Sequence, residues 1–468
     1  MRLLHTETRQ LREFLDGNPP NEYFTLSHRW TGDEISYKEY CKGTKVDSPG
    51  YKKVEDCCKF LQAKHGSSWV WIDTICIDKR SSAELSEAIN SMWEWYWGAK
   101  TCYAYLADVD ISPGSEHENV CDESYMKELE SQLRNSEWFC RGWTLQELLA
   151  PRRVQILNQN WQILGHKEAQ DGLDFLRVGA RGPNLNVVLS GITAIGEQYL
   201  EDRWTIQNRA SIACRMSWAS RRKTTKREDQ AYCLLGIFNI NMPLLYGERE
   251  GAFRRLQEEL IRTSNDQSIF GWRLKGSLPR VGMLALGPSD FKHSGDISWY
   301  PAHASLCTME ITNRGVKVHG TVQKHALHLQ TLIKRVSEDT DTRLRYKHIL
   351  KHLGQYETND RGNIELLGVP LNCRDYLSNA PSMIYLVRYE IENIRAWIRF
   401  SLDQYLATYS SNAREDVTPI LEESVTTTVI AEAGHTLRLL EWRAHEQESK
   451  QHSMEHQGKR LLSVTRCV

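Results

Sequence analysis

Short apolar runs alternate with amphipathic segments between Tyr23 and Leu164, and this alternation is the clearest pattern in the chain. The apolar runs have the length of strands, whereas the segments between them repeat apolar residues at helical spacing. Strands joined by helices are typical of a parallel α/β sheet. We therefore predict a doubly wound domain with strands at 23–30, 68–78, 101–109 and 152–161, and helices at 52–66, 81–100 and 141–151.

Local signals support several of these elements. Gly66 follows the helix at 52–66 and is a typical helix end. Ser81 and Glu84 have the spacing of a capping box, in which each side chain binds the other residue's backbone N–H. The run at 68–78 is almost continuously apolar, which indicates a strand buried on both faces of the sheet.

The pattern changes twice after this domain. Residues 166–270 look helical, with amphipathic segments at 227–238 and 251–263 as the clearest examples. From residue 271 onward β-like runs dominate, and the sequence around Asn313–Gly315 predicts a hairpin. The β-like runs lie at 383–391, 396–402, 426–432 and 435–442. We predict a sheet domain at 1–165, a helical region at 166–270 and a β-rich C-terminal domain at 271–468.

Composition limits the classes of function. The 59 basic and 60 acidic residues give a net charge of -1, so we expect neither a nucleic acid nor an anionic membrane as partner. No apolar stretch approaches the roughly 20 residues of a membrane span, and charged residues interrupt the start of the chain, so no signal peptide is predicted. The 12 cysteines are scattered without a C-x-x-C motif, so we expect a cytoplasmic protein without disulfides, metal or bound cofactor.

Polar side chains follow the predicted strands at the edge where doubly wound sheets bind ligands, beyond the carboxyl ends of the strands. The first strand ends in Ser27, His28, Arg29 and Trp30. There Arg29 suits a phosphate or ribose and Trp30 a stacked ring, although a loop with an aromatic anchor would have the same sequence. Asp73 interrupts the second apolar run, where an unpaired carboxylate is costly, and it belongs either to a site or to the cap of the next turn.

The helix predicted at 141–151 brings Trp143 and Glu147 to one face, opposite its leucines. Pro151 ends this helix, so it is short. A carboxylate beside an aromatic ring at the ligand edge is a candidate catalytic group. A solvated glutamate on an ordinary helix would give the same pattern.

Three further features of the sequence give little support to other functions. The basic run Arg221–Arg227 has the composition of a nuclear localisation or nucleic-acid patch, but the net charge favours a solvated loop. Cys140 stands beside Arg141, which can lower the pKa of a thiol, yet no histidine is near it in sequence to support a thiol protease. The chain has no G-x-x-x-x-G-K-[ST] motif, which argues against a P-loop ATPase.

Taken in order, the segments YFTLSHRW, WVWIDTICID and CRGWTLQELLAP resemble the three signature blocks of the fungal heterokaryon incompatibility (HET) domain. A later block that begins MSWASRRKTTKRED is similar to the segment that commonly follows a HET domain. The resemblance therefore covers roughly residues 1–272. HET domains are associated with allorecognition, in which fusion of unlike fungal cells triggers death of the mixed cell.

HET domains also look like remote relatives of TIR domains, which have a flavodoxin-like sheet and cleave NAD in several lineages. In those enzymes the catalytic glutamate follows a tryptophan by four positions, as Glu147 follows Trp143 here. A serine that precedes the tryptophan in TIR domains has no equivalent before Trp143, and Ser136–Trp138 offers the serine without a glutamate four residues later. The resemblance implies a flavodoxin-like (TIR-like) sheet, a catalytic Glu147, and substrate-binding roles for Ser27, His28, Arg29, Trp30, Asp73 and Trp143.

Two functions follow from this resemblance. One is an incompatibility effector that hydrolyses the nicotinamide–ribosyl bond of NAD, with NAD as substrate and with homo-oligomers forming on activation. In that reaction Glu147 would stabilise the oxocarbenium-like transition state, as glycosidase carboxylates do. The alternative is a non-catalytic module that self-associates, with the C-terminal domain binding a protein partner.

Overall fold

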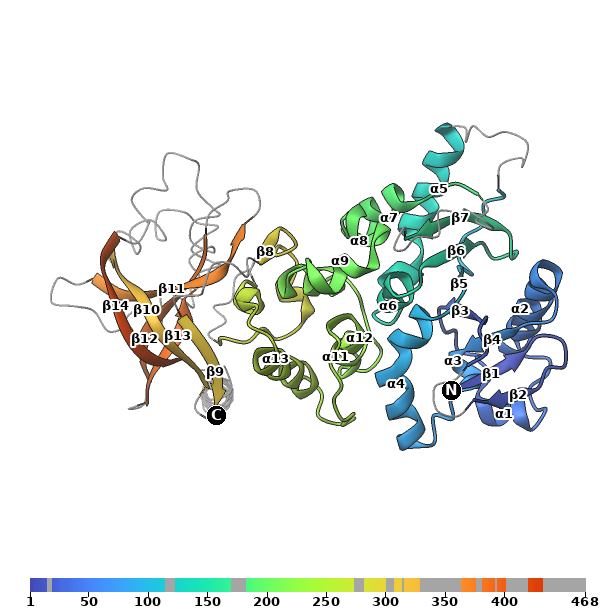
Figure 1. Ribbon diagram of the computed structural model, residues 1–468, viewed down its shortest axis with the longest axis horizontal. Helices are drawn as coiled ribbons and strands as arrows, with labels where there is room; N and C mark the ends of the chain where they lie inside the picture. Colours follow the sequence, from blue (N-terminus) through green and yellow to red (C-terminus); the bar gives the residue numbers. More distant parts are fainter. Residues whose placement is uncertain are drawn as a thin grey trace, which may run out of the picture. The chain divides into compact units, whose positions relative to one another are not determined.

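A mixed β-sheet organises the N-terminal part of the chain (Figure 1). In this computed structural model four parallel strands lie in the order β4-β3-β5-β6. Antiparallel strands extend the sheet at both edges, β1 and β2 beside β4, and β7 beside β6. The strands are β1 Arg2–His5, β2 Leu11–Glu13, β3 Phe24–His28, β4 Trp69–Ile72, β5 Thr101–Tyr105, β6 Arg153–Leu157 and β7 Ile163–Glu168.

The structure describes residues 1–14, 19–113, 123–169, 182–272, 282–299, 307–313, 315–328, 363–375, 381–391, 394–400 and 420–431. They form two units, Met1–Leu260 with Leu286–Asp296, and Ile261–Ala285 with Ile297–Val468. Within these described ranges no helix combines the length and the apolar character that a membrane crossing needs.

The four predicted strands are present and parallel, and in chain order they have the spatial order 2-1-3-4. The antiparallel strands at the two edges were not predicted, and because of them the sheet is mixed rather than purely parallel. β7 returns beside β6 through a turn in which the Asn158 side chain accepts hydrogen bonds from the N–H groups of Asn160 and Gln162, both 2.9 Å. A side chain that binds backbone two residues on is a common device of tight turns, but it leaves no periodic signal.

Helices cover both faces of the sheet because successive side chains of a strand point to opposite faces. On one face Tyr103 of β5 meets Phe60 of α2, with ring centroids 5.1 Å apart. On the other face Trp71 of β4 meets Tyr96 of α4 at 5.4 Å. Figure 1 shows α2 and α4 on opposite sides of the strands. The helices of this layer are α1 Tyr37–Cys41, α2 Pro49–His65, α3 Asp73–Cys76, α4 Ser82–Trp97, α5 Glu123–Asn135, the 3-10 helix η1 Glu137–Cys140 and α6 Thr144–Leu149.

Two of the predicted helix ends are observed. α2 ends at Gly66, whose φ of +72° is one that favours glycine. α4 begins after Ser81, which accepts a hydrogen bond from the N–H of Glu84. The second half of the predicted capping box is missing, because the Glu84 carboxylate instead accepts from the N–H of Asp78 and from Arg2, both at 2.7 Å.

The strand predicted at 68–78 is wrong in its second half. β4 ends at Ile72, and the following residues form the single helical turn α3. Ile75 and Cys76 are buried in this turn, so the same apolar residues serve the core in helical form. An apolar run cannot separate a buried strand from a buried helical turn.

The helical region is present, but one of its predicted helices is divided. Residues 227–238 form two short turns, α11 Asp229–Tyr232 and α12 Leu235–Phe238. α12 packs closely on α4, since a Cβ at Gly236 would lie 2.2 Å from the Cβ of Trp93. The other helices are α7 Asn186–Thr193, α8 Glu197–Glu201, α9 Arg203–Asn208, α10 Ile212–Ala219, α13 Gly251–Thr263 and the 3-10 helix η3 Pro288–Phe291.

The second unit contains a sheet with the order β8-β11-β12-β13-β14-β10-β9. The predicted hairpin is present, since β9 and β10 pair antiparallel with Thr312 opposite Gly315. The run predicted at 435–442 lies outside the described residues. The elements are η2 Gln267–Phe270, β8 Ile297–Trp299, β9 Cys307–Thr312, β10 Gly315–His328, β11 Asn363–Asp375, β12 Pro381–Ile391, β13 Ile394–Phe400 and β14 Ile420–Ala431.

A glycine in the first turn of α2 tests the packing beside β3. The N–H of Gly50 donates to the carbonyl of Asp33 (3.1 Å), and a Cβ at Gly50 would lie 2.5 Å from that oxygen. The new Cβ is fixed to the backbone of α2, and the oxygen belongs to the backbone of Asp33, so neither atom can move aside easily. We therefore expect Gly50→Ala to lower the free energy of unfolding by about 1–3 kcal/mol. Gly32→Ala, with no atom within 4 Å of the new Cβ, is the matched control and should change it by less than about 0.5 kcal/mol in urea unfolding. Equal effects of the two substitutions would contradict this packing.

Candidate functional site

The carboxyl end of β3 sends two neighbouring side chains to opposite faces of the sheet. His28 shares its face with Phe24, whose ring stacks on His65 of α2 at 4.2 Å. Ser27 points to the other face, toward α4 and α6. Ser27 is fully buried and His28 is only 6% exposed. The residues predicted to form one site are therefore divided between two clusters.

The first cluster joins Ser27 to Glu147, which are 120 residues apart in sequence. The Ser27 hydroxyl donates to Oε2 of Glu147 at 2.5 Å and accepts from the indole N–H of Trp138 at 2.9 Å. All six residues of α6 are buried, and Glu147 is 8% exposed. The glutamate is therefore a buried group held by a defined hydrogen-bond chain, and the idea of a solvated glutamate does not fit this geometry.

Burial raises the pKa of Glu147 to about 8, from an ordinary value of 4.5. The hydrogen bond from Ser27 and the charges of Arg141 and Arg222 lower the pKa, whereas Asp73 raises it further. Burial dominates because a charged carboxylate loses its hydration in the interior. At neutral pH the Glu147 carboxyl is mostly protonated.

The second cluster surrounds His28. Its Nε2 lies 3.6 Å from Oε2 of Glu34 and 3.9 Å from Oδ1 of Asp73, both too long for a hydrogen bond. This buried nitrogen has no hydrogen-bond partner among the described residues. Burial acts to raise the pKa of Glu34, but His28 and Lys53 outweigh it and hold that pKa well below its usual range. The cluster combines a buried imidazole with carboxylates on two sides.

Trp30 forms the exposed end of the second cluster. Its indole N–H donates to Oδ2 of Asp73 at 2.9 Å, and the ammonium of Lys79 lies 3.3 Å from the centre of its ring. The Trp30 side chain remains 40% exposed. The predicted partners Trp30, His28 and Asp73 are thus brought together, with Asp73 at the first position of α3 rather than inside a strand.

Arg29 and Trp143 lie apart from both clusters. Arg29 forms an ion pair with Glu137, and both side chains are exposed. Trp143 precedes α6 and donates its indole N–H to Oδ2 of Asp229 at 3.2 Å. Its hydrogen bond therefore joins α6 to the helical region, and it is Trp138 whose indole is linked to Glu147 through Ser27.

The basic run Arg221–Arg227 is largely engaged with its own unit. Arg222 donates to the carbonyl of Arg141 at 2.8 Å and to the hydroxyl oxygen of Thr144 at 2.9 Å. Arg227 pairs with Glu250, and the Lys226 ammonium lies 3.9 Å from the centre of the Tyr246 ring. Three cations of the run thus have partners, one of them at the start of α6.

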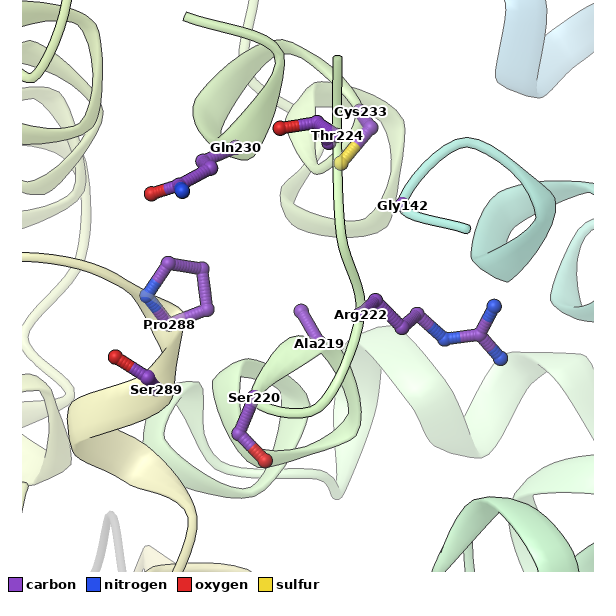
Figure 2. A pocket seen from close by; sticks show the side chains of 9 residues that line it. All are labelled: Gly142, Ala219, Ser220, Arg222, Thr224, Gln230, Cys233, Pro288 and Ser289. Carbon is purple, nitrogen blue, oxygen red and sulfur yellow. The ribbon is translucent and has the colours of Figure 1, made fainter. Parts of the chain in front are cut away.

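Two cavities lie near these elements. One of about 60 Å³ is lined by residues that include Gly142, Thr224 and Cys233, and the Arg222 guanidinium points away from it (Figure 2). The other, of about 620 Å³, is lined by residues that include Tyr23 and Trp95. Tyr23 directly precedes β3, so the larger cavity lies at the amino edge, opposite the predicted ligand edge. Neither cavity is lined by Glu147.

In the described ranges no group of three or more His, Cys, Asp or Glu side chains is arranged to hold a metal ion. Cys140 is exposed, and its carbonyl accepts a hydrogen bond from the N–H of Lys223 at 2.6 Å.

Sequence reasoning missed several residues in or beside the clusters. Trp138 belonged to the weaker match at Ser136–Trp138, so a signal for it existed. Tyr96, whose pKa is raised by burial and by the nearby Glu147, was one of the apolar residues at helical spacing that predicted α4. Arg222 was one of several cations in a basic run. Glu34 carried no signal, because its partner His28 lies across a loop and only the fold brings them together.

Comparisons with known proteins bear on the same residues. Residues 23–147 match the family described as heterokaryon incompatibility protein (HET), and residues 251–282 match a domain of unknown function. The vegetative incompatibility protein HET-E-1 of Podospora anserina is 37% identical over 268 residues. This alignment covers 56% of the present chain but only 18% of that relative. No solved structure matches the chain.

The raised pKa of Glu147 predicts how stability varies with pH. The folded carboxyl keeps its proton up to about pH 8, whereas the unfolded one releases it above about pH 4.5. The folded state therefore binds more protons between these values, and its stability falls as the pH rises, by up to about 1.4 kcal/mol per pH unit. We expect Glu147→Gln to remove this contribution, so that the variant gains stability relative to the unchanged protein from pH 5 to pH 8.

Urea unfolding at pH 5, 6, 7 and 8 measures this difference. Glu201→Gln, the same change at an exposed residue of α8, is the control and should leave the pH dependence unaltered. Parallel pH profiles for Glu147→Gln and the unchanged protein would show that Glu147 titrates as it does in solvent.

Proposed function

We propose that this chain, whose residues 23–147 match the HET family, acts in heterokaryon incompatibility, as an effector whose activity kills the mixed cell. The HET match runs from Tyr23 into α6 and contains both clusters, whereas Arg222 and Asp229 lie outside it. A relative named for vegetative incompatibility supports the same role. The chain spans less than a fifth of that relative, so the proposal rests on the part that they share.

The proposed chemistry is hydrolysis of the nicotinamide–ribosyl bond of NAD in a TIR-like domain. One observation carries it: the hydrogen bond between Ser27 and Glu147 places a buried carboxyl at the carboxyl edge of the parallel strands. That edge is where doubly wound sheets bind nucleotides. The spatial order 2-1-3-4 of the parallel strands agrees with the flavodoxin-like order that TIR domains have.

In this reaction the bond between the ribose carbon and the nicotinamide nitrogen breaks, and water forms a new bond to the same carbon. The products are nicotinamide, ADP-ribose and a proton. Positive charge develops on the ribose as nicotinamide leaves, and an ionised Glu147 would stabilise it from close range. Ser27 holds the Glu147 carboxyl, and Trp138 holds Ser27.

The second cluster supplies groups suited to the remainder of the substrate. The free Nε2 of His28 can bind a sugar hydroxyl, and the exposed Trp30 can stack on a base. Arg29 would exchange its exposed partner Glu137 for the pyrophosphate, because exposed ion pairs contribute little. Trp143 then positions α6 through Asp229 rather than forming a wall of the substrate site.

A second candidate function is supported by the burial of the same glutamate. Glu147 is 8% exposed and lines neither of the two cavities, so among the described residues its carboxyl has little access to solvent. A module that only self-associates, with a protein partner bound by the domain from residue 271, would need no open site. In the enzymatic proposal, assembly on activation opens the carboxyl edge to NAD.

Replacement of Glu147 separates the two functions. Glu147→Gln keeps the volume but removes the charge, so nicotinamide release from NAD should fall by about a hundredfold or more while the fold is retained. Release is measured on the purified chain with and without a crowding agent that promotes assembly, beside the control Glu201→Gln. If Glu147→Gln protein still releases nicotinamide, or still kills cells that express it, the enzymatic proposal fails at this residue and the interaction module replaces it.

The pH dependence of the reaction follows from the same pKa. Only the ionised form of Glu147 can stabilise the developing positive charge, and its fraction rises about tenfold per pH unit below the pKa of about 8. We therefore expect the rate of nicotinamide release to rise from pH 6 to pH 8 and to level off above. A rate that is constant over this range would mean that ionisation of Glu147 does not limit the reaction.

A further inference from the structure

The basic run Arg221–Arg227 is joined to the segment that begins α6. The N–H of Lys223 donates to the carbonyl of Cys140 at 2.6 Å, and the N–H of Gly142 donates back to the carbonyl of Lys223 at 2.9 Å. The approach is close, since a Cβ at Gly142 would lie 2.5 Å from Cγ2 of Thr224. Residues about 80 positions apart thus run side by side immediately before the helix that carries Glu147.

Arg222 extends this contact into a chain of hydrogen bonds. Its guanidinium donates to the hydroxyl oxygen of Thr144, and that hydroxyl donates to the carbonyl of Trp138 at 2.6 Å. The indole of Trp138 then donates to Ser27, which donates to Glu147. The chain begins on a residue outside the HET match and ends on the candidate catalytic carboxyl.

We propose that Arg222 is a positioning residue for Glu147: it fixes Thr144 and Trp138 at the start of α6 and places a half-buried positive charge within electrostatic reach of the carboxyl. The role in NAD cleavage rests on the proposed function, whereas the link between Arg222 and Glu147 does not depend on it. Figure 2 is consistent with this role, since the Arg222 guanidinium extends away from the small cavity.

The effect of Arg222 on Glu147 can be measured through the pKa of Glu147. Burial lowers the pKa of the Arg222 guanidinium to about 10, so it remains charged at neutral pH. Removing a positive charge disfavours the ionised carboxyl, and the pKa of Glu147 should rise. The titratable groups that act on Glu147 come from α3, α4, β5, the start of α6 and the basic run, and they are Asp73, Tyr96, Cys102, Arg141 and Arg222.

An arginine that only braces a loop would give a different result. Its loss would lower the melting temperature but would leave the titration of Glu147 where it was. The decisive quantity is therefore the titration midpoint of Glu147, followed by ¹³C NMR of the full chain labelled at glutamate carboxyl carbons. The Glu147 signal is identified by its absence from the Glu147→Gln spectrum.

Arg222→Met removes the donors and the charge while keeping the length of the side chain. We expect the midpoint of Glu147 to rise by roughly one pH unit, and nicotinamide release at pH 7 to fall about tenfold with it. Arg222→Lys keeps the charge and should shift the midpoint less. Arg221→Met, at the exposed neighbour, is the matched control and should not shift it.

Thr144→Val, with nearly the same shape, covers the case in which Arg222→Met does not fold. It interrupts the chain between Arg222 and Trp138 and should also raise the midpoint of Glu147. An unchanged midpoint in Arg222→Met, or in Thr144→Val if only that variant folds, overturns the proposal. Because the midpoint needs no substrate, a shifted midpoint without any nicotinamide release would sink the NAD reaction and leave the positioning role standing.

Discussion

The hydrogen bond between Ser27 and Glu147 is the contact on which the arrangement of the site depends. It joins Ser27, the penultimate residue of β3, to a short helix far along the chain. Both partners are buried, so water cannot substitute for either of them. A carboxyl that is buried so deeply needs a donor to be tolerated at all. η1 adds to this contact, because its Trp138 indole donates to the same hydroxyl.

The sequence predicted the parallel strands, the helices on both faces and the edge at which the polar residues gather. These features come from periodicity, which local residues determine. The antiparallel edge strands and the single turn α3 were missed, because short strands and buried turns produce no distinctive period. The grouping of the site was missed for another reason: Ser27 and His28 are neighbours in sequence, and the pleat of β3 sends them to different faces.

The roles of the tryptophans show where spacing alone misleads. Trp143 and Glu147 share a helical face by arithmetic, yet the Trp143 indole donates to Asp229 of the helical region. Trp138 occupies the position beside Ser27 although it precedes α6. A helix of six residues is oriented by its neighbours more than by its own periodicity, so the sequence could indicate Glu147 but not the ring that accompanies it.

The pairing of residues 140–144 with the segment that begins at Arg222 bears on how such proteins can be recombined. The HET match ends at Glu147, while the arginine that reaches the start of α6 lies well beyond it. A sheet domain transplanted from one family member onto the helical region of another would inherit a foreign loop at this contact. Such a chimaera would keep the contact only where residues 140–144 and the segment that begins at Arg222 come from the same protein.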